Sequence, residues 1–129
     1  MRRLLLDTHA LLWCLADDPA LSARARRAVL EPSAEVNVSA ASAWEIATKV
    51  RLGRLPDFAA FAVDLDALLS KADYRLLPIS FRHGQRAGSY PTPVKDPFDR
   101  MLAAQAEIES LALVTADAAF TQFPVTTIW

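Results

Sequence analysis

Residues 3–16 read RLLLDTHALLWCLA, and this stretch decides the fold. The run 3–6 is short and apolar and ends at Asp7, which is typical of a strand buried on both faces of a sheet. Residues 9–16 are apolar on most faces and predict a helix that follows the strand at once. A strand that passes directly into a helix indicates an α/β protein, in which ligands bind at the carboxyl ends of the strands.

The same alternation of strands and helices continues to the end of the chain. The predicted strands are 3–6, 35–38, 74–77, 111–114 and 125–128, and the predicted helices are 9–16, 23–30, 40–51, 57–70, 80–87 and 97–110. Ser22, Ser39 and Asp96 are suitable N-caps for three of these helices, and residues 88–95, which contain two prolines, predict a loop. The alternation predicts a three-layer α/β/α fold with a mostly parallel sheet of about five short strands.

The composition bounds the class of protein. The 129 residues fit a single domain, 1–129, and at 53% hydrophobic they supply ample material for one core. The formal net charge of −1 excludes a general polyanion binder, so any contact with nucleic acid depends on a local basic patch. The single cysteine, Cys14, excludes an internal disulfide and suits a reducing cytoplasm. No stretch is long and apolar enough to span a membrane.

Four acidic residues stand where apolar stretches meet helices, and they are the candidate functional residues. They are Asp7, Glu45, Asp99 and Asp117. Carboxylates gathered at one edge of a sheet repel one another, and a divalent cation among them would allow all of them to stay ionised. We therefore expect the four side chains to converge in one pocket at the carboxyl ends of the strands.

Each acid also has a purely structural interpretation. Asp7 and Asp117 suit helix capping, and Asp99 lies in the first turn of a helix, where a negative charge favours the helix dipole. Glu45 can pair with Lys49 at i,i+4 spacing, for only about 0.2–0.5 kcal/mol. Because Glu45 lies well inside an apolar helix, it is not a cap, and it is the most discriminating of the four.

Other residues allow a few further expectations. Two histidines, His9 and His83, are too few and too far apart in sequence to suggest a zinc site, and none of the three glycines follows a strand as a phosphate-binding loop requires. Thr115 can hydrogen-bond a carboxylate or a metal-bound water. The candidate phosphate contacts are Lys49, Arg51, Arg54, Lys95 and Arg100.

Four segments together resemble PIN-domain ribonucleases, specifically the VapC-like toxins of bacterial type II toxin–antitoxin modules. The segments are LLLDTHALLWCLADDP, VSAASAWEIATKVRLGRLP, KDPFDRMLAAQA and LALVTADAAF, and they follow the expected order over nearly the whole chain. The resemblance implies a PIN-like fold and matches Asp7, Glu45, Asp99 and Asp117 to the family's four acidic active-site positions. Members often carry histidines shortly before DPFDR, where this chain has TPV at 92–94.

The resemblance also implies an activity and partners. The activity is Mg²⁺- or Mn²⁺-dependent cleavage of RNA phosphodiester bonds, with the four acids as both metal ligands and catalytic groups. Asp7 and Asp99 would be the firmest ligands, Asp117 would complete the metal shell, and Glu45 would bind a second ion or orient the attacking water. The implied partners are an RNA substrate, a second copy in a homodimer, and a cognate antitoxin whose tail wraps the toxin.

Two other classes of function stay open at this point. The chain could be a non-catalytic PIN-like interaction module whose acids only cap helices. It could also be a phosphoryl-transfer α/β domain, such as a receiver or a haloacid-dehalogenase-like phosphatase. The first strand ends in a single Asp, which disfavours a receiver, and the absence of a second Asp two residues after Asp7 disfavours the phosphatase.

Two predicted helices carry more large apolar side chains than one core needs. They are Leu11, Leu12, Trp13 and Leu15 in 9–16, and Phe58, Phe61, Leu65, Leu68 and Leu69 in 57–70. We expect part of this surface to be exposed and covered by a small protein partner. An arginine from that partner would enter the acidic pocket and compete with the metal.

Overall fold

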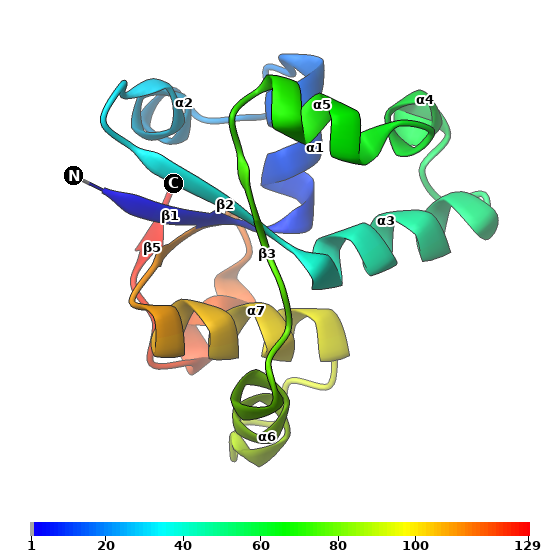
Figure 1. The fold of residues 1–129 in the computed structure, drawn as a ribbon. Helices are drawn as coiled ribbons and strands as arrows, with labels where there is room; N and C mark the ends of the chain where they lie inside the picture. Colours follow the sequence, from blue (N-terminus) through cyan, green and yellow to red (C-terminus); the bar gives the residue numbers. More distant parts are fainter. Residues whose placement is uncertain (1) are drawn as a thin grey trace.

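Five parallel strands form the centre of the molecule (Figure 1). The structure is a computed structural model and describes residues 2–129. The strands are β1 (Arg3–Leu6), β2 (Glu35–Ser39), β3 (Arg75–Leu77), β4 (Ala112–Val114) and β5 (Thr127–Ile128). Their order is β3-β2-β1-β4-β5, and each neighbouring pair is parallel. The predicted α/β fold with five short parallel strands is confirmed, with β1 at the centre.

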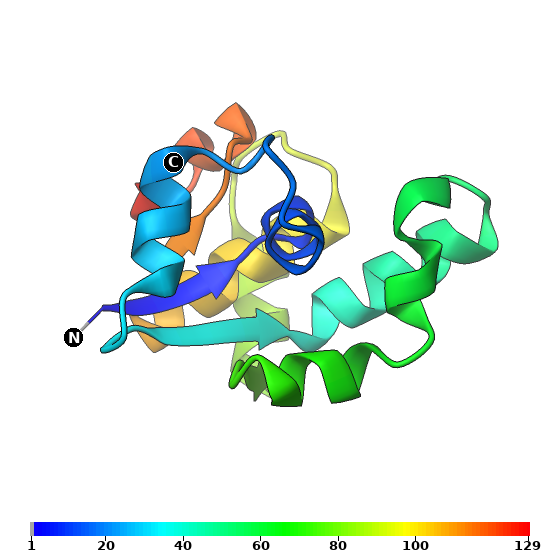
Figure 2. The same cartoon turned by 90° about the horizontal axis from the view of Figure 1, so that it is seen from above.

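Helices cover both faces of the sheet and complete the three layers (Figures 1 and 2). They are α1 (Thr8–Ala16), α2 (Ala23–Leu30), α3 (Ala40–Arg51), α4 (Ala59–Ala62), α5 (Leu65–Lys71), α6 (Phe81–Ser89) and α7 (Pro97–Glu109), with 3-10 helices η1 (Pro56–Phe58) and η2 (Ala118–Gln122). Leu4 and Leu6 join the core under α1 and α2, whereas Leu5 joins the core against α6 and α7. Successive strand residues point to opposite faces, so β1 contributes to both cores.

The strand register brings the carboxyl ends of β1, β2 and β4 to the same edge of the sheet. Leu6 of β1 is level with Val38 of β2 and with Val114 of β4. The residue that follows each strand therefore emerges at one edge, as in other parallel sheets that bind ligands at their carboxyl ends.

Side-chain caps start the helices at the predicted places. Ser22, Ser39 and Asp96 each accept a backbone N–H at the start of α2, α3 and α7, as predicted. Asp7 caps α1 in the same way, and Ser80 caps α6 in a capping box with His83. Each such cap typically contributes about 1 kcal/mol to stability.

The predicted continuous helix over 57–70 is wrong. The segment consists of η1, α4 and α5, with a turn at Val63 and Asp64 between the last two. The backbone of Asp64, at φ −133° and ψ 47°, is not helical. Apolar residues keep their helical spacing across this turn, so the pattern alone could not reveal the break.

Other boundaries differ by a few residues. Helix α6 continues through Gly88 and Ser89, so the loop predicted at 88–95 begins at Tyr90. Strands β3 and β4 begin one residue later than predicted, and β5 is reduced to two residues. Among residues 2–129, no helix has the length and apolar character needed to cross a membrane.

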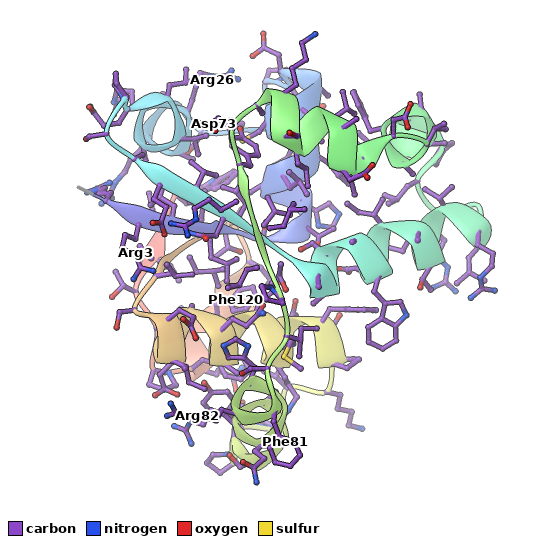
Figure 3. The ribbon with its side chains drawn as sticks, viewed as in Figure 1. Arg3, Arg26, Asp73, Phe81, Arg82 and Phe120 are labelled. Atoms are coloured by element: carbon purple, nitrogen blue, oxygen red, sulfur yellow. The ribbon has the colours of Figure 1, made fainter. Side chains whose placement is uncertain are left out.

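The apolar surface lies elsewhere than predicted. Leu11, Leu12 and Leu69 are buried in the core, and the other apolar residues named in the two helices are half-buried. The large apolar side chains that are exposed are Leu30, Trp44, Leu52, Val63, Leu76, Ile79 and Phe81. Phe81 projects from α6, far from the sheet (Figure 3). The exposed apolar surface therefore belongs mainly to α3, the 63–64 turn, β3 and the segment after β3.

Candidate functional site

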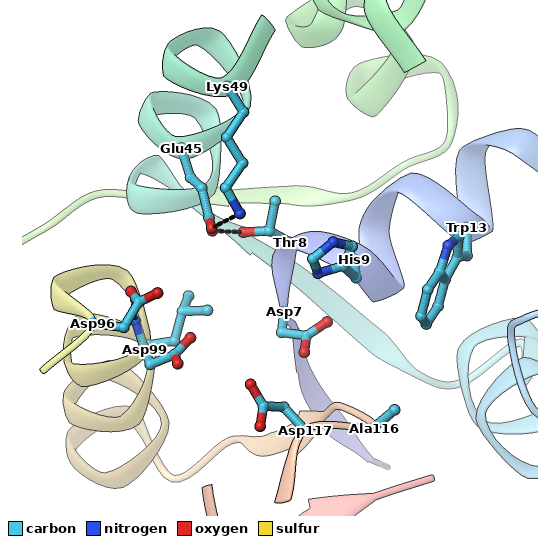
Figure 4. Close-up of a pocket in the computed structure, with 11 residues that line it drawn as sticks. Asp7, Thr8, His9, Trp13, Glu45, Lys49, Asp96, Asp99, Ala116 and Asp117 are labelled. Carbon is cyan, nitrogen blue, oxygen red and sulfur yellow. Dashed lines mark hydrogen bonds and ion pairs between the residues drawn. The ribbon is translucent and has the colours of Figure 1, made fainter. Parts of the chain in front are cut away.

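One pocket at the carboxyl ends of β1 and β4 holds the four predicted acids (Figure 4). Asp7 follows β1, Asp117 follows β4, Glu45 comes from α3 and Asp99 from the first turn of α7. The pocket has a volume of about 250 Å³. Four segments that are far apart in the sequence thus meet around a space large enough for a few water molecules or a hydrated ion.

Asp7 is held in place by the helix that it caps and by a strand neighbour. One carboxylate oxygen accepts the N–H of Ala10 at 2.8 Å, and the other accepts the hydroxyl of Thr115 at 2.5 Å. Burial raises the pKa of Asp7, and these two hydrogen bonds partly offset the rise. Asp7 therefore caps α1 and lines the pocket with the same carboxyl group.

Glu45 is buried and already has two partners. One carboxylate oxygen accepts the hydroxyl of Thr8 at 2.5 Å, and the other lies 2.7 Å from the ammonium of Lys49. Thr8 also lies 3.0 Å from Ser42 through its hydroxyl oxygen. The i,i+4 pair expected from the sequence exists, and it lies inside the pocket rather than on an open surface.

Asp99 carries the strongest electrostatic perturbation in the pocket. Burial raises its pKa to about 7, and negative charges on nearby acids add to the rise. These charges are on Asp96, Asp117, Glu45 and Asp7. Asp96, not Asp99, caps α7, accepting the N–H groups of Phe98 and Asp99 at 2.8 and 3.1 Å. The Asp99 carboxylate is therefore the group that would gain most from a cation.

Asp117 is exposed and faces the pocket from the strand side (Figure 4). Its carboxylate caps η2 by accepting the N–H of Ala119 at 2.9 Å. Its own N–H donates to the hydroxyl oxygen of Thr115 at 3.0 Å, and that hydroxyl donates to Asp7. Thr115 thus links two of the acids, as its position after β4 suggested.

The carboxylate oxygens that line the pocket are of the chemical type that a hard divalent cation binds. Carboxylate oxygens are the ligands that Mg²⁺ and Mn²⁺ prefer. Acidic side chains outnumber the one lysine, Lys49, among the residues that line the pocket, and their charges add to the effect of burial in raising the pKa of Asp99. As the side chains stand, no three acidic, histidine or cysteine groups among residues 2–129 converge closely enough to form a complete metal site.

Sequence reasoning missed several residues at the pocket. Thr8, Trp13 and Asp96 line it, as does the exposed His9. The ring of His9 lies 5.6 Å from that of Trp13. The adjacency of Thr8 and His9 to Asp7 was the available signal, since residues that open a helix after a strand share its edge of the sheet.

Arg100 is not a free phosphate ligand. Its guanidinium donates to the backbone carbonyls of Ala87, Gly88, Tyr90, Thr92 and Val94. The side chain therefore binds the end of α6 and the following loop to the first turn of α7, next to Asp99.

Comparison with known proteins agrees with this architecture. VapBC2 from Rickettsia felis, solved with a DNA fragment from its promoter, is 16% identical with a TM-score of 0.70, over 97% of this chain and 96% of that chain. VapBC-1 from nontypeable Haemophilus influenzae is 17% identical with a TM-score of 0.68, over 97% and 96%. PAE2754 from Pyrobaculum aerophilum is 21% identical with a TM-score of 0.58, over 98% and 83%. At these identities the likeness shows a shared fold.

Sequence comparison gives the family. No match was found among curated protein sequences. The family model of the PIN domain matches residues 4–125, from the central strand to the last segment before β5. This chain therefore belongs to the PIN domain family.

Proposed function

We propose that this protein is a Mg²⁺- or Mn²⁺-dependent ribonuclease and the toxin of a VapC-like toxin–antitoxin module. The observation that carries the proposal is the meeting of four carboxylates in one pocket, with the pKa of Asp99 raised to about 7 by burial and by the other acids. Membership of the PIN domain family supports a nuclease. The similar structures from Rickettsia felis and Haemophilus influenzae are VapBC proteins, which supports the toxin assignment.

The pocket residues would divide the work as follows. A bound divalent ion supplies charge stabilisation at the phosphodiester and an activated water. Asp7 is the preorganised ligand, because Thr115 and the start of α1 fix its carboxylate. Asp99 and Asp117 offer carboxylates from the other walls of the pocket. Glu45, which is hydrogen-bonded to Thr8 and paired with Lys49, would accept a proton from water or hold a second ion.

Helix capping alone does not account for the pocket. Asp7 and Asp117 do cap helical segments, but Asp96 caps α7 in place of Asp99, and Glu45 lies inside α3. Two acids thus have no capping role. Burying unneutralised carboxylates together destabilises a fold, so the arrangement favours a cation-binding function over a purely structural one.

The test combines metal binding with RNA cleavage. We expect Mn²⁺ to bind in calorimetry and RNA to be cleaved only while a divalent ion is present. Asp99→Asn should abolish both, whereas Asp57→Asn, which changes an exposed acid of η1, should alter neither. Cleavage that persists in excess chelator, or Mn²⁺ binding that is unaffected by Asp99→Asn, would refute the proposal.

We also infer a protein partner on an apolar groove between α3, α4, α5 and β3. The groove has a volume of about 660 Å³, and two of its apolar residues, Val63 and Leu76, are 82% and 60% exposed. Helix α3 separates the groove from the acidic pocket, with Ala43 on one side and Glu45 and Lys49 on the other. A cognate antitoxin with an apolar segment and a flanking arginine fits both surfaces, and Val63→Asp should prevent its binding in a pull-down.

A further inference from the structure

An aromatic pair joins two of the helices that line the acidic pocket. Trp44 of α3 and Phe98 of α7 meet edge to face, with ring centroids 4.8 Å apart and planes at 71°. Trp44 directly precedes Glu45, and Phe98 directly precedes Asp99. The pair therefore joins the two helices that supply two of the four pocket acids, one residue away from each acid.

A structural role explains only part of this arrangement. An edge-to-face aromatic pair contributes about 0.5–1.5 kcal/mol and can link α3 to α7. A tryptophan that served only this purpose would be expected to bury most of its surface, yet Trp44 is 61% exposed. Its indole therefore offers open aromatic surface of the kind on which proteins stack unpaired bases.

We propose that Trp44 and Phe98 form a stacking site for an unpaired nucleobase of single-stranded RNA, next to the phosphodiester bound at the acidic pocket. This inference rests on the proposed function. Lys49 lies in the pocket on the same helix as Trp44, and the exposed Lys95 lies just before α7. Lys49 is already paired with Glu45 at 2.7 Å, so the exposed Lys95, three residues before Phe98, is the cation available to a phosphate next to the stacked base.

Stacking predicts a defined loss of affinity. Base–aromatic stacking contributes about 1–3 kcal/mol per base, which corresponds to about a 5- to 150-fold change in Kd. The binding of an unstructured, fluorescently labelled RNA hexamer is measured by anisotropy, with Ca²⁺ in place of Mg²⁺ so that cleavage does not interfere. We expect Trp44→Ala to weaken binding within that range and Trp44→Phe to restore most of it.

A matched control is Phe81→Ala. Phe81 is 83% exposed but belongs to α6, which does not line the pocket, so its removal should leave RNA affinity unchanged. If Trp44→Ala binds the hexamer as tightly as wild type, the stacking site is refuted. If it instead weakens self-association or antitoxin binding and leaves RNA affinity unchanged, the pair belongs to a protein interface and the inference is also refuted.

A second readout follows Trp44 directly. In a Trp13→Phe, Trp129→Phe background the only tryptophan left is Trp44. Its fluorescence should be quenched by the RNA hexamer but not by an abasic ribose-phosphate hexamer of the same charge. Quenching by RNA with no cleavage under any metal would retain the stacking site and refute the nuclease. Metal-dependent cleavage without quenching would refute the stacking site and retain the nuclease.

Discussion

At the scale of single residues, Thr115 forms hydrogen bonds with two of the four acids. Its hydroxyl donates to Asp7 at 2.5 Å and accepts the N–H of Asp117 at 3.0 Å. Thr115→Ala leaves the buried Asp7 carboxylate without this donor, so we expect a loss of about 1–3 kcal/mol in the free energy of unfolding by urea. Weaker Mn²⁺ binding in calorimetry should accompany it. Thr121→Ala, which removes an exposed hydroxyl bonded to the carbonyl of Ala118, is the matched control and should be nearly neutral.

Asp99 makes the metal-free protein sensitive to pH. Burial first, and neighbouring acids second, raise its pKa from 3.8 to about 7, so the folded protein binds this proton more tightly than the unfolded chain. Its contribution to stability is therefore complete below about pH 4 and is lost as the pH rises through 7. Thermal melts in chelator should show this loss between pH 4 and 7 for wild type and a smaller one for Asp99→Asn. Equal pH dependence in the two proteins would contradict this assignment.

Substitution of Asp99 also separates function from folding. Asp99→Asn removes one charge from a pocket of like charges, so we expect the metal-free variant to melt at or above the wild-type temperature while RNA cleavage is lost. Asp96 remains to cap α7, so the helix keeps its start. A large fall in melting temperature would instead indicate that the Asp99 carboxylate supports α7 itself.

At the scale of elements, Arg100 fixes the loop between α6 and α7. Five backbone carbonyls share its guanidinium, and lysine cannot satisfy that many acceptors with one ammonium group. We expect Arg100→Lys to lower the free energy of unfolding by about 1.5–3 kcal/mol. Faster amide exchange at 90–95 should localise the effect. Arg82→Lys, an exposed change on α6, controls for charge and length.

The elements show which parts of the fold could be predicted. Short apolar runs bounded by Asp or Ser gave β1, β2, α3 and α7, because capping and burial act on neighbouring residues. The helix break at 63–64 and the carbonyl partners of Arg100 depend on backbone geometry, which could not be predicted from the residue types. The four acids could be expected at one end of the sheet because each follows an apolar run or lies in a helix beside one, whereas the structure was needed to show that Thr8 and Asp96 also line the pocket. The catalytic and metal-binding roles of the acids stay predictions.

At the scale of the whole molecule, two surfaces lie on opposite sides of α3. The groove between α3, α4, α5 and β3 is apolar, and the pocket that contains Glu45 is acidic. One partner chain could therefore occupy both, with its apolar segment in the groove and a basic side chain in the pocket.

The family resemblance also implies a homodimer. We expect the isolated protein to form one, and size-exclusion chromatography with light scattering tests this. A concentration-independent monomer mass would count against it.

Occupation of the pocket by a partner's arginine and by a metal should be mutually exclusive. Guanidinium and divalent cation would compete for the same carboxylates, so the antitoxin should weaken Mn²⁺ binding, typically about 5- to 150-fold. Linkage requires Mn²⁺ to weaken antitoxin binding by the same factor, and calorimetry in both directions measures the two. Val63→Asp should block antitoxin binding and leave Mn²⁺ affinity unchanged, because Val63 lines the groove and not the pocket. An antitoxin that binds equally well with and without Mn²⁺ would show that its contacts stop at the groove and leave the acids free.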